Sequence, residues 1–216
     1  MSEIVETINP AQKERIDKLA ILNRYAKKGQ ILFTGSSLME QFPVDELLIN
    51  SGLNVIIYNR GVGGFTTADM LAHMEEMVFG TEPSKIFINI GSNDIGAADF
   101  SMAHLLGNYE NILRQISVRL PQAEIYVMAY YPVNETDKVP EGEWGQVAFV
   151  NRNNETIGEV NLEIEQLAKR LGCHFINVND GLTDERGKLK KEYTVEGIHM
   201  YANAYQQILQ NMTPYL

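Results

Sequence analysis

The chain has 216 residues, of which 44% are hydrophobic, and its 18 Lys and Arg against 28 Asp and Glu give a formal charge of −10. This length and apolar content suffice for a sizeable core, so one α/β domain over residues 1–216 is expected. The negative charge repels phosphate backbones and anionic membrane surfaces, and no basic patch offsets it. Nucleic acid is therefore not an expected partner.

The N-terminus and the cysteine content bear on the cellular compartment. Cys173 is the only cysteine, so it has no internal disulfide partner and gives no zinc-site spacing, which favours a reducing compartment. Residues 1–6 lack the basic and apolar regions of a signal peptide, and no stretch reaches the roughly 18 to 20 apolar residues that span a bilayer. We expect a cytoplasmic protein without a transmembrane segment. The charge does not forbid a homodimer.

Short apolar runs alternate along the chain with longer segments of helical period. A first helix is expected over about residues 10–27, with Pro10 suited to its first turn. Strands buried on both faces are expected at 31–34, 55–58, 86–90, 125–129 and 174–178. Apolar stripes of helical spacing occupy 102–116, 157–171 and 201–212. The alternation predicts an α/β fold with a five-stranded parallel sheet, and ligands bind such sheets at the carboxyl ends of the strands.

The first such strand end carries a serine. After residues 31–34 the chain reads Gly35-Ser36-Ser37, where the glycine allows a tight turn. A serine at the start of the next helix exposes its hydroxyl near backbone N–H groups and the positive end of the helix dipole. This position suits a nucleophile beside an oxyanion site, but serine is also a favoured helix cap, so both interpretations stand for this motif alone.

Two further strand ends offer hydrogen-bond donors. Gly61, Gly63 and Gly64 follow the second strand and let the backbone approach a ligand, although their spacing is not that of a dinucleotide site and a plain turn is equally compatible. After the third strand, Asn93 stands in Gly91-Ser92-Asn93-Asp94. Its amide could stabilise a developing negative charge, or it could cap the next helix.

Near the C-terminus, Glu196 stands three residues before His199. A carboxylate at this spacing can hydrogen-bond the imidazole across one turn, fix its tautomer and support the imidazolium formed when a hydroxyl proton is taken. The same spacing often marks only a helix start. His73, His104 and His174 have no such companion at a strand end, so structural or surface roles are expected for them.

These motifs occur in the order nucleophile, backbone donor, side-chain donor, and acid with base, each after a strand of one sheet. From about residue 30 to about residue 205 the chain resembles the SGNH (GDSL-type) hydrolases, and in particular the subgroup similar to platelet-activating-factor acetylhydrolase. The resemblance implies a flavodoxin-like three-layer αβα sandwich, with Ser37 as nucleophile and His199 as general base. It also implies an oxyanion hole formed by the N–H groups of Ser37 and Gly64 and the amide of Asn93, without metal or organic cofactor.

Two positions depart from the family pattern. Ser36 stands where the family name has Asp, a residue that is not the proton acceptor. Glu196 stands where the family has the Asp that orients the histidine, and glutamate reaches one methylene further. We keep Glu196 as the orienting acid, with Asp180 or a backbone carbonyl as alternative partners of the imidazole.

The expected activity is hydrolysis of small carboxylic esters, with short-chain acyl or acetyl esters favoured. Two alternatives stay open: a carbohydrate acetylesterase with the same machinery, and a non-catalytic module that binds an anion or small molecule on a flavodoxin-like sheet. Tyr130, Tyr131 and Trp144 could line an acyl or sugar pocket or serve as packing residues, so no substrate-binding residue is assigned.

Overall fold

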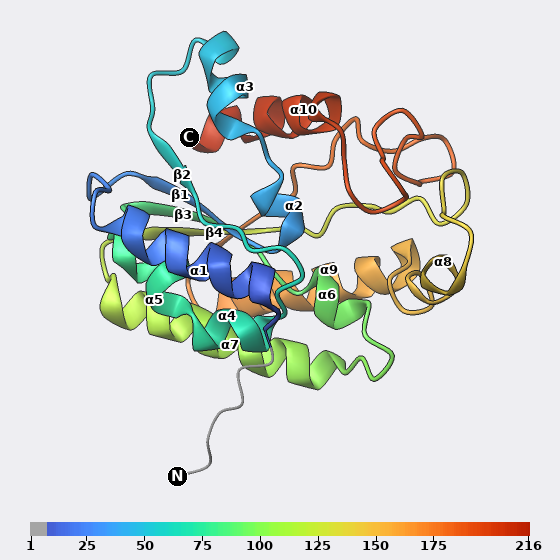
Figure 1. Cartoon of the computed structure of the whole chain (residues 1–216), viewed down its shortest axis with the longest axis horizontal. Coiled ribbons are helices and arrows are strands. Elements are labelled where there is room, and N and C mark those ends of the chain that lie inside the picture. Colours follow the sequence, from blue (N-terminus) through green and yellow to red (C-terminus); the bar gives the residue numbers. More distant parts are fainter. Residues whose placement is uncertain (1–7) are drawn as a thin grey trace.

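A five-stranded parallel sheet forms the centre of the molecule (Figure 1). The computed structural model describes residues 8–216. The strands are β1 (Ile31–Gly35), β2 (Ile57–Asn59), β3 (Lys85–Asn89), β4 (Glu124–Met128) and β5 (His174–Ile176). Their order in the sheet is β2-β1-β3-β4-β5, which is the flavodoxin-like order. The predicted parallel sheet is confirmed, and each strand overlaps its predicted range.

Helices cover both faces of the sheet, which makes the predicted three-layer αβα sandwich (Figure 1). On one face lie α1 (Pro10–Asn23), α4 (Thr67–Ala72), α5 (Met74–Met77), α7 (Met102–Arg119) and α9 (Asn154–Arg170). On the other face lie α2 (Ser37–Glu40), α3 (Val44–Ser51) and α10 (Ala202–Met212). The remaining short elements are η1 (Phe79–Thr81), α6 (Ser92–Ile95), α8 (Glu143–Val147) and η2 (Thr213–Tyr215).

Two hydrophobic cores follow from the alternation of strand side chains. Successive residues of a strand point to opposite faces, so Leu32 and Ile86 join the core beneath α7 and α9, whereas Phe33 and Phe87 join the core beneath α10. The expectation that all five strands are buried on both faces is wrong for the outer two. Tyr58 in β2 and residues 174–175 in β5 are partly exposed, because these strands form the sheet edges.

The N-terminal helix is shorter than the predicted range of 10–27. It ends at Asn23, whose buried side chain donates to the carbonyl of Glu76 at 2.9 Å and accepts from Nε of Arg60 at 2.8 Å. The N–H groups of residues 24–26 then bond the carbonyls three residues earlier, which tightens the chain into turns. The apolar pattern would extend this helix to about residue 27, but α1 ends where the side chain of Asn23 makes its tertiary hydrogen bonds.

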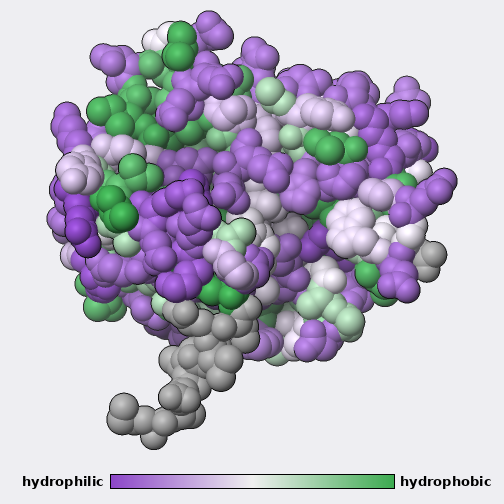
Figure 2. All heavy atoms as spheres, in the orientation of Figure 1, coloured by the Kyte–Doolittle hydropathy of each residue, from purple (hydrophilic) through white to green (hydrophobic). Residues whose placement is uncertain are grey.

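The visible surface is mainly hydrophilic, and one hydrophobic group gathers over α3 and the adjoining part of β2 (Figure 2). The exposed apolar side chains of this region include Ile49, at 81% exposure, and Ile56, at 44%. No helix within residues 8–216 is long and apolar enough to cross a membrane. The expectation about a signal peptide concerns residues 1–6, which lie outside the described residues.

Gly35 ends β1 at a point where no other residue fits. Its φ is +153°, and a Cβ atom there would lie 1.9 Å from the carbonyl oxygen of Asn89 on the neighbouring β3. We expect Gly35→Ala to lower the free energy of unfolding by about 3 kcal/mol or more, because backbone would have to move in the middle of the sheet. Urea unfolding followed by circular dichroism measures the loss.

Gly107 in α7 provides the matched control for this substitution. A Cβ at Gly107 meets nothing within 4 Å, so Gly107→Ala should raise the free energy of unfolding by about 0.4 to 1 kcal/mol through helix propensity and unfolded-state entropy. An unchanged urea midpoint for Gly35→Ala would contradict the close approach of β1 and β3 at this glycine.

Candidate active site

Three side chains from distant parts of the sequence form a continuous hydrogen-bonded chain. Ser37 begins α2 directly after β1, and its Oγ lies 2.9 Å from Nε2 of His199, 162 positions away. Nδ1 of His199 in turn lies 2.5 Å from Oε1 of Glu196. The structure thus brings together the serine, the histidine and the carboxylate that the sequence singled out. A neutral imidazole in this chain can accept the serine proton while its other nitrogen donates to the carboxylate.

The loop that carries the carboxylate and the imidazole is not the helical turn suggested by their spacing. Residues 194–200 form a closed loop, and α10 begins only at Ala202. The Thr194 hydroxyl accepts the N–H of Gly197 at 2.7 Å and donates to the carbonyl of His199 at 3.0 Å. Oε1 of Glu196 also accepts the backbone N–H of His199, at 3.0 Å. These bonds fix the longer glutamate side chain against the imidazole.

The Glu196 carboxylate is held in its charged form. Burial raises the pKa of this carboxyl, but hydrogen bonds from the side chain and backbone of His199 outweigh burial and leave the pKa below its usual value of 4.5. The Glu196 side chain is 18% exposed and that of His199 is 28% exposed. The carboxylate therefore stays ionised at neutral pH beside an imidazole that solvent can still reach.

The glycine loop after β2 approaches the serine, since a Cβ at Gly63 would lie 3.7 Å from Cβ of Ser37. Gly64, with φ of +77°, is exposed, and its N–H finds no acceptor within residues 8–216. The N–H of the preceding Gly63 donates instead to Oε2 of Glu40 at 2.7 Å, which leaves Gly64 as the free donor of this loop. The helix-dipole argument for Ser37 carries little weight, because α2 is a single turn of four residues.

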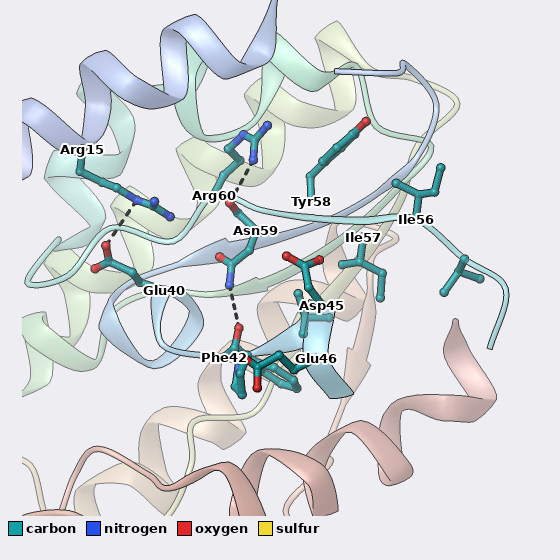
Figure 3. A pocket seen from close by; sticks show the side chains of 13 residues that line it. Arg15, Glu40, Phe42, Asp45, Glu46, Ile56, Ile57, Tyr58, Asn59 and Arg60 are labelled. Carbon is teal, nitrogen blue, oxygen red and sulfur yellow. Dashed lines mark hydrogen bonds and ion pairs between the residues drawn. The ribbon is translucent and has the colours of Figure 1, made fainter. Parts of the chain in front are cut away.

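The glycine loop is braced by the N-terminal helix. Gln12 of α1 donates to the carbonyl of Gly63 at 2.8 Å, and Nε of Arg15 donates to the carbonyl of Gly61 at 3.2 Å. Figure 3 shows Arg15 and Glu40 pointing toward one another, and they form an ion pair of 3.3 Å. No local pattern indicates this bracing, since Gln12 and Arg15 lie more than forty residues before the carbonyls they bond.

Asn93 lies at the start of α6 with both ends of its amide engaged. Its Nδ2 donates to the carbonyl of Phe65 at 2.9 Å, and its Oδ1 accepts from Nη2 of Arg152 at 3.2 Å. One N–H of the amide remains for a further acceptor. Sequence reasoning missed Arg152, because an arginine between a loop and the cap of α9 carries no signal that it is buried.

Asp94, the neighbour of Asn93, ties two of the strand-end loops together. Its carboxylate accepts the hydroxyl of Thr67 in a short hydrogen bond and the N–H of Thr67 at 3.0 Å. Burial raises the pKa of the Asp94 carboxyl, and the hydrogen bonds from Thr67 act in the opposite direction. Asn108 of α7 donates to the same hydroxyl at 3.1 Å. The start of α4, which follows the glycine loop, and α6, which carries Asn93, are therefore fixed relative to one another.

The structure shows the surroundings of the alternative imidazole partner, Asp180, and of the three aromatic residues that could line a pocket. Asp180 is exposed, and its carbonyl accepts from Asn211 at 2.8 Å, whereas the imidazole of His199 contacts Glu196. Tyr130 and Tyr131 are each 3% exposed and serve as packing residues. Trp144 in α8 is 47% exposed, and its ring meets that of Phe149 edge-on at 6.4 Å.

A large pocket lies elsewhere, beside the edge strand β2 (Figure 3). It has a volume of about 600 Å³ and is lined by residues of α3, β2 and the Arg15–Glu40 pair. Neither Ser37 nor His199 lines it. We place the site at the serine and histidine rather than in this pocket, because the pocket contains no nucleophile paired with a base.

The fold and the site define a hydrolase on a flavodoxin-like sheet, and comparison with known proteins gives its family. The model of the GDSL-like lipase/acylhydrolase family matches residues 41–207, a segment that includes Gly64, Asn93, Glu196 and His199 and begins just after Ser37. The chain belongs to this family. It is an enzyme of the esterase and acylhydrolase class.

Solved structures agree with this assignment. A structure from Streptococcus pneumonia, whose name refers to platelet activating factor, has a TM-score of 0.84 at 33% identity and is matched over 94% of this chain and 92% of its own. A GDSL-like lipase from Bacteroides thetaiotaomicron has a TM-score of 0.73 at 20% identity, over 93% of this chain and 98% of its own. The acetylxylan esterase Axe2 from Geobacillus stearothermophilus has a TM-score of 0.63 at 14% identity, over 87% and 94%. The latter two show the shared fold.

One curated protein is also similar. The N-acylneuraminate cytidylyltransferase of Escherichia coli O18:K1:H7 is 24% identical over 190 residues, which is 88% of this chain. The chain spans only 40% of the length of that protein.

Proposed function

We propose that this protein is a serine esterase that hydrolyses carboxylic esters of short acyl groups, with Ser37 as nucleophile and His199 as general base. The observation that carries the proposal is the hydrogen-bonded chain from Ser37 Oγ through the imidazole of His199 to Glu196, with distances of 2.9 and 2.5 Å. A serine hydroxyl is a weak nucleophile until a positioned base takes its proton. The imidazole of His199 contacts the Ser37 hydroxyl and can take its proton, and the Glu196 carboxylate stabilises the imidazolium that results.

The reaction proceeds in two acyl-transfer steps. Ser37 Oγ bonds to the ester carbonyl carbon while its proton passes to Nε2 of His199, and the tetrahedral oxyanion accepts hydrogen bonds from the N–H groups of Ser37 and Gly64 and the amide of Asn93. His199 then gives the proton to the leaving alcohol. In the second step water adds to the acyl-enzyme, His199 takes a proton from it, and the carboxylic acid leaves as that proton returns to Ser37.

The side chains packed against the loop of His199 suggest where the substrate lies. A Cβ at Gly197 would lie 2.7 Å from the ring of Phe149, so the segment after α8 packs against the loop of His199. Trp144 packs on Phe149 and is half exposed. We propose that this aromatic wall contacts the alcohol or acyl part of the ester. The likeness in fold to an acetylxylan esterase makes acetylated carbohydrate the second substrate class to test.

A panel of p-nitrophenyl esters from acetate to octanoate, together with an acetylated xylo-oligosaccharide, tests the activity and the acyl preference. We expect the highest kcat/KM for acetate or butyrate. A serine-directed phosphonate should add one covalent group to the chain, located at Ser37 by peptide mass spectrometry. Absence of both turnover and adduct would favour the non-catalytic binding module.

Asn93→Ala is expected to lower kcat by about 10²- to 10³-fold with little change in KM, because one oxyanion donor stabilises the transition state by roughly 2.7 to 4 kcal/mol. Steady-state kinetics with p-nitrophenyl acetate measure the change. Asn50→Ala, at an exposed position in α3, is the matched control and should keep the wild-type kcat. An unchanged kcat for Asn93→Ala would remove Asn93 from the oxyanion hole.

A further inference from the structure

Arg152 is a buried arginine beside the proposed oxyanion hole. It is 9% exposed and lies between α8 and the start of α9. Its Nε donates to the carbonyl of Ser92 at 2.9 Å, and its Nη2 donates to Oδ1 of Asn93 at 3.2 Å. The guanidinium thus hydrogen-bonds two consecutive residues of α6, and the second of them, Asn93, is the side-chain donor of the proposed mechanism.

The cost of burying this charge indicates a role beyond packing. Arg152 forms no ion pair within residues 8–216, and its hydrogen bonds there go to neutral oxygens. Burial lowers the pKa of the guanidinium, and the negative charge of Glu196 acts in the opposite direction. An unpaired buried charge costs more than an apolar side chain of the same size, so stability alone does not account for an arginine at this position.

We propose that Arg152 is a positioning residue that orients and polarises the Asn93 amide for oxyanion stabilisation. The proposal rests on the proposed function, since it requires Asn93 to act as the oxyanion donor. No catalytic contact of Arg152 with the substrate is involved, because its hydrogen bonds go to the α6 residues.

The orientation follows from the chemistry of the amide. Nδ2 of Asn93 faces the Phe65 carbonyl and Oδ1 faces the guanidinium. A flipped amide would place two donors against each other at Arg152 and two acceptors against each other at Phe65, so the guanidinium excludes that state. The positive guanidinium beside Oδ1 also draws electron density from Nδ2. It thereby strengthens the hydrogen bond that the free N–H of Nδ2 donates.

Gly96 offers a way to move the guanidinium without removing it. A Cβ at Gly96 would lie 2.2 Å from Nη2 of Arg152 and 2.6 Å from its Cζ. The φ of Gly96 is −76°, which alanine adopts freely, so the strain of Gly96→Ala falls on the flexible end of the arginine side chain. This variant should fold and should displace the guanidinium from Asn93.

The test is a double-mutant cycle between Arg152→Gln and Asn93→Ala, measured as kcat with p-nitrophenyl acetate. Arg152→Gln and Gly96→Ala should each lower kcat by about 10- to 100-fold, with KM changed by less than about threefold. In the Asn93→Ala background the same changes should lower kcat by less than about threefold, because the group through which Arg152 acts is gone.

Arg60→Gln is the matched control of the cycle. Arg60 is also a buried arginine, at 6% exposure, and its side chain bonds Asn23 and the carbonyl of Asn59 instead of α6. Its fold-effect on kcat should be the same in the wild-type and Asn93→Ala backgrounds, as for any structural change remote from Asn93. Thermal melting of every variant shows whether it is folded at the temperature at which kcat is measured.

The outcomes separate this inference from the proposed function. If the losses for Arg152→Gln and Gly96→Ala multiply fully with that of Asn93→Ala, or if Gly96→Ala keeps the wild-type kcat, the inference is overturned and the esterase mechanism stands. If Asn93→Ala alone leaves kcat unchanged while Ser37→Ala abolishes it, the donor role of Asn93 and this inference fall together. If Ser37→Ala also retains activity, the proposed function itself fails.

Discussion

Replacing Ser37 with alanine is expected to lower kcat for p-nitrophenyl acetate by about 10⁴- to 10⁶-fold, because the nucleophile of the acyl-transfer step is lost. KM should change little, since binding of the ester does not depend on the covalent bond. Stability should fall by no more than about 1 kcal/mol, because within residues 8–216 the hydroxyl makes one hydrogen bond, to His199. Phosphonate labelling should disappear in the same variant, which distinguishes loss of the nucleophile from loss of the oxyanion donors.

Ser36 supplies the matched control for the nucleophile test. It is adjacent in sequence, 1% exposed, and its hydroxyl finds no hydrogen-bond partner within residues 8–216. Ser36→Ala removes the same oxygen one residue earlier, so it should keep the wild-type kcat and leave stability unchanged or slightly raised. Equal loss of activity in Ser36→Ala and Ser37→Ala would mean that the turn after β1 has been damaged, and it would leave the assignment of Ser37 unsupported.

The sheet could be predicted because buried parallel strands have a strong local signal. Each strand is a short apolar run bounded by polar residues, and the central strands are covered on both faces, so their composition alone identifies them. The helix ends are harder to predict from the sequence. Where α1 ends, the side chain of Asn23 bonds Glu76 and Arg60, which are more than thirty residues away in sequence. Contacts at such separation are absent from any local pattern.

The sequence singled out the serine, histidine and glutamate that the structure brings into contact, but not the side chains that support them. Ser37, Gly64 and Asn93 come shortly after β1, β2 and β3, whose carboxyl ends meet at one edge of the parallel sheet, whereas His199 lies well after β5 in the loop before α10. The supporting side chains instead come from α1 and from the loop before α9, as with Arg152. Such side chains are recognised only by burial and by hydrogen bonds to distant carbonyls, which depend on the completed fold.

Glu196→Gln is expected to lower kcat by about 10²- to 10⁴-fold, by analogy with the loss of charge in a Ser-His-Asp triad. The carboxylate accepts both the Nδ1 proton and the backbone N–H of His199 on one oxygen. An amide can keep that geometry but cannot stabilise the imidazolium, and its NH₂ group can instead turn toward Nδ1 and favour the wrong tautomer. The pH profile of kcat/KM, with Ser37 intact, measures how far the remaining imidazole still acts as a base.

The same substitution has a pH-dependent effect on stability, whose sign follows from the lowered pKa of Glu196. In the folded state this pKa lies below 4.5, so the carboxylate stabilises the fold above that pH, and the contribution is lost as the pH falls through the folded-state value. The difference in unfolding free energy between wild type and Glu196→Gln should therefore stay constant near neutral pH and shrink as the pH falls from about 4.5 through the folded-state pKa of Glu196. Glu192→Gln, at an exposed position four residues earlier, is the matched control and should keep the wild-type kcat. A stability difference that grows in acid would mean that the carboxyl is protonated beside His199, and the orienting acid would have to be sought elsewhere.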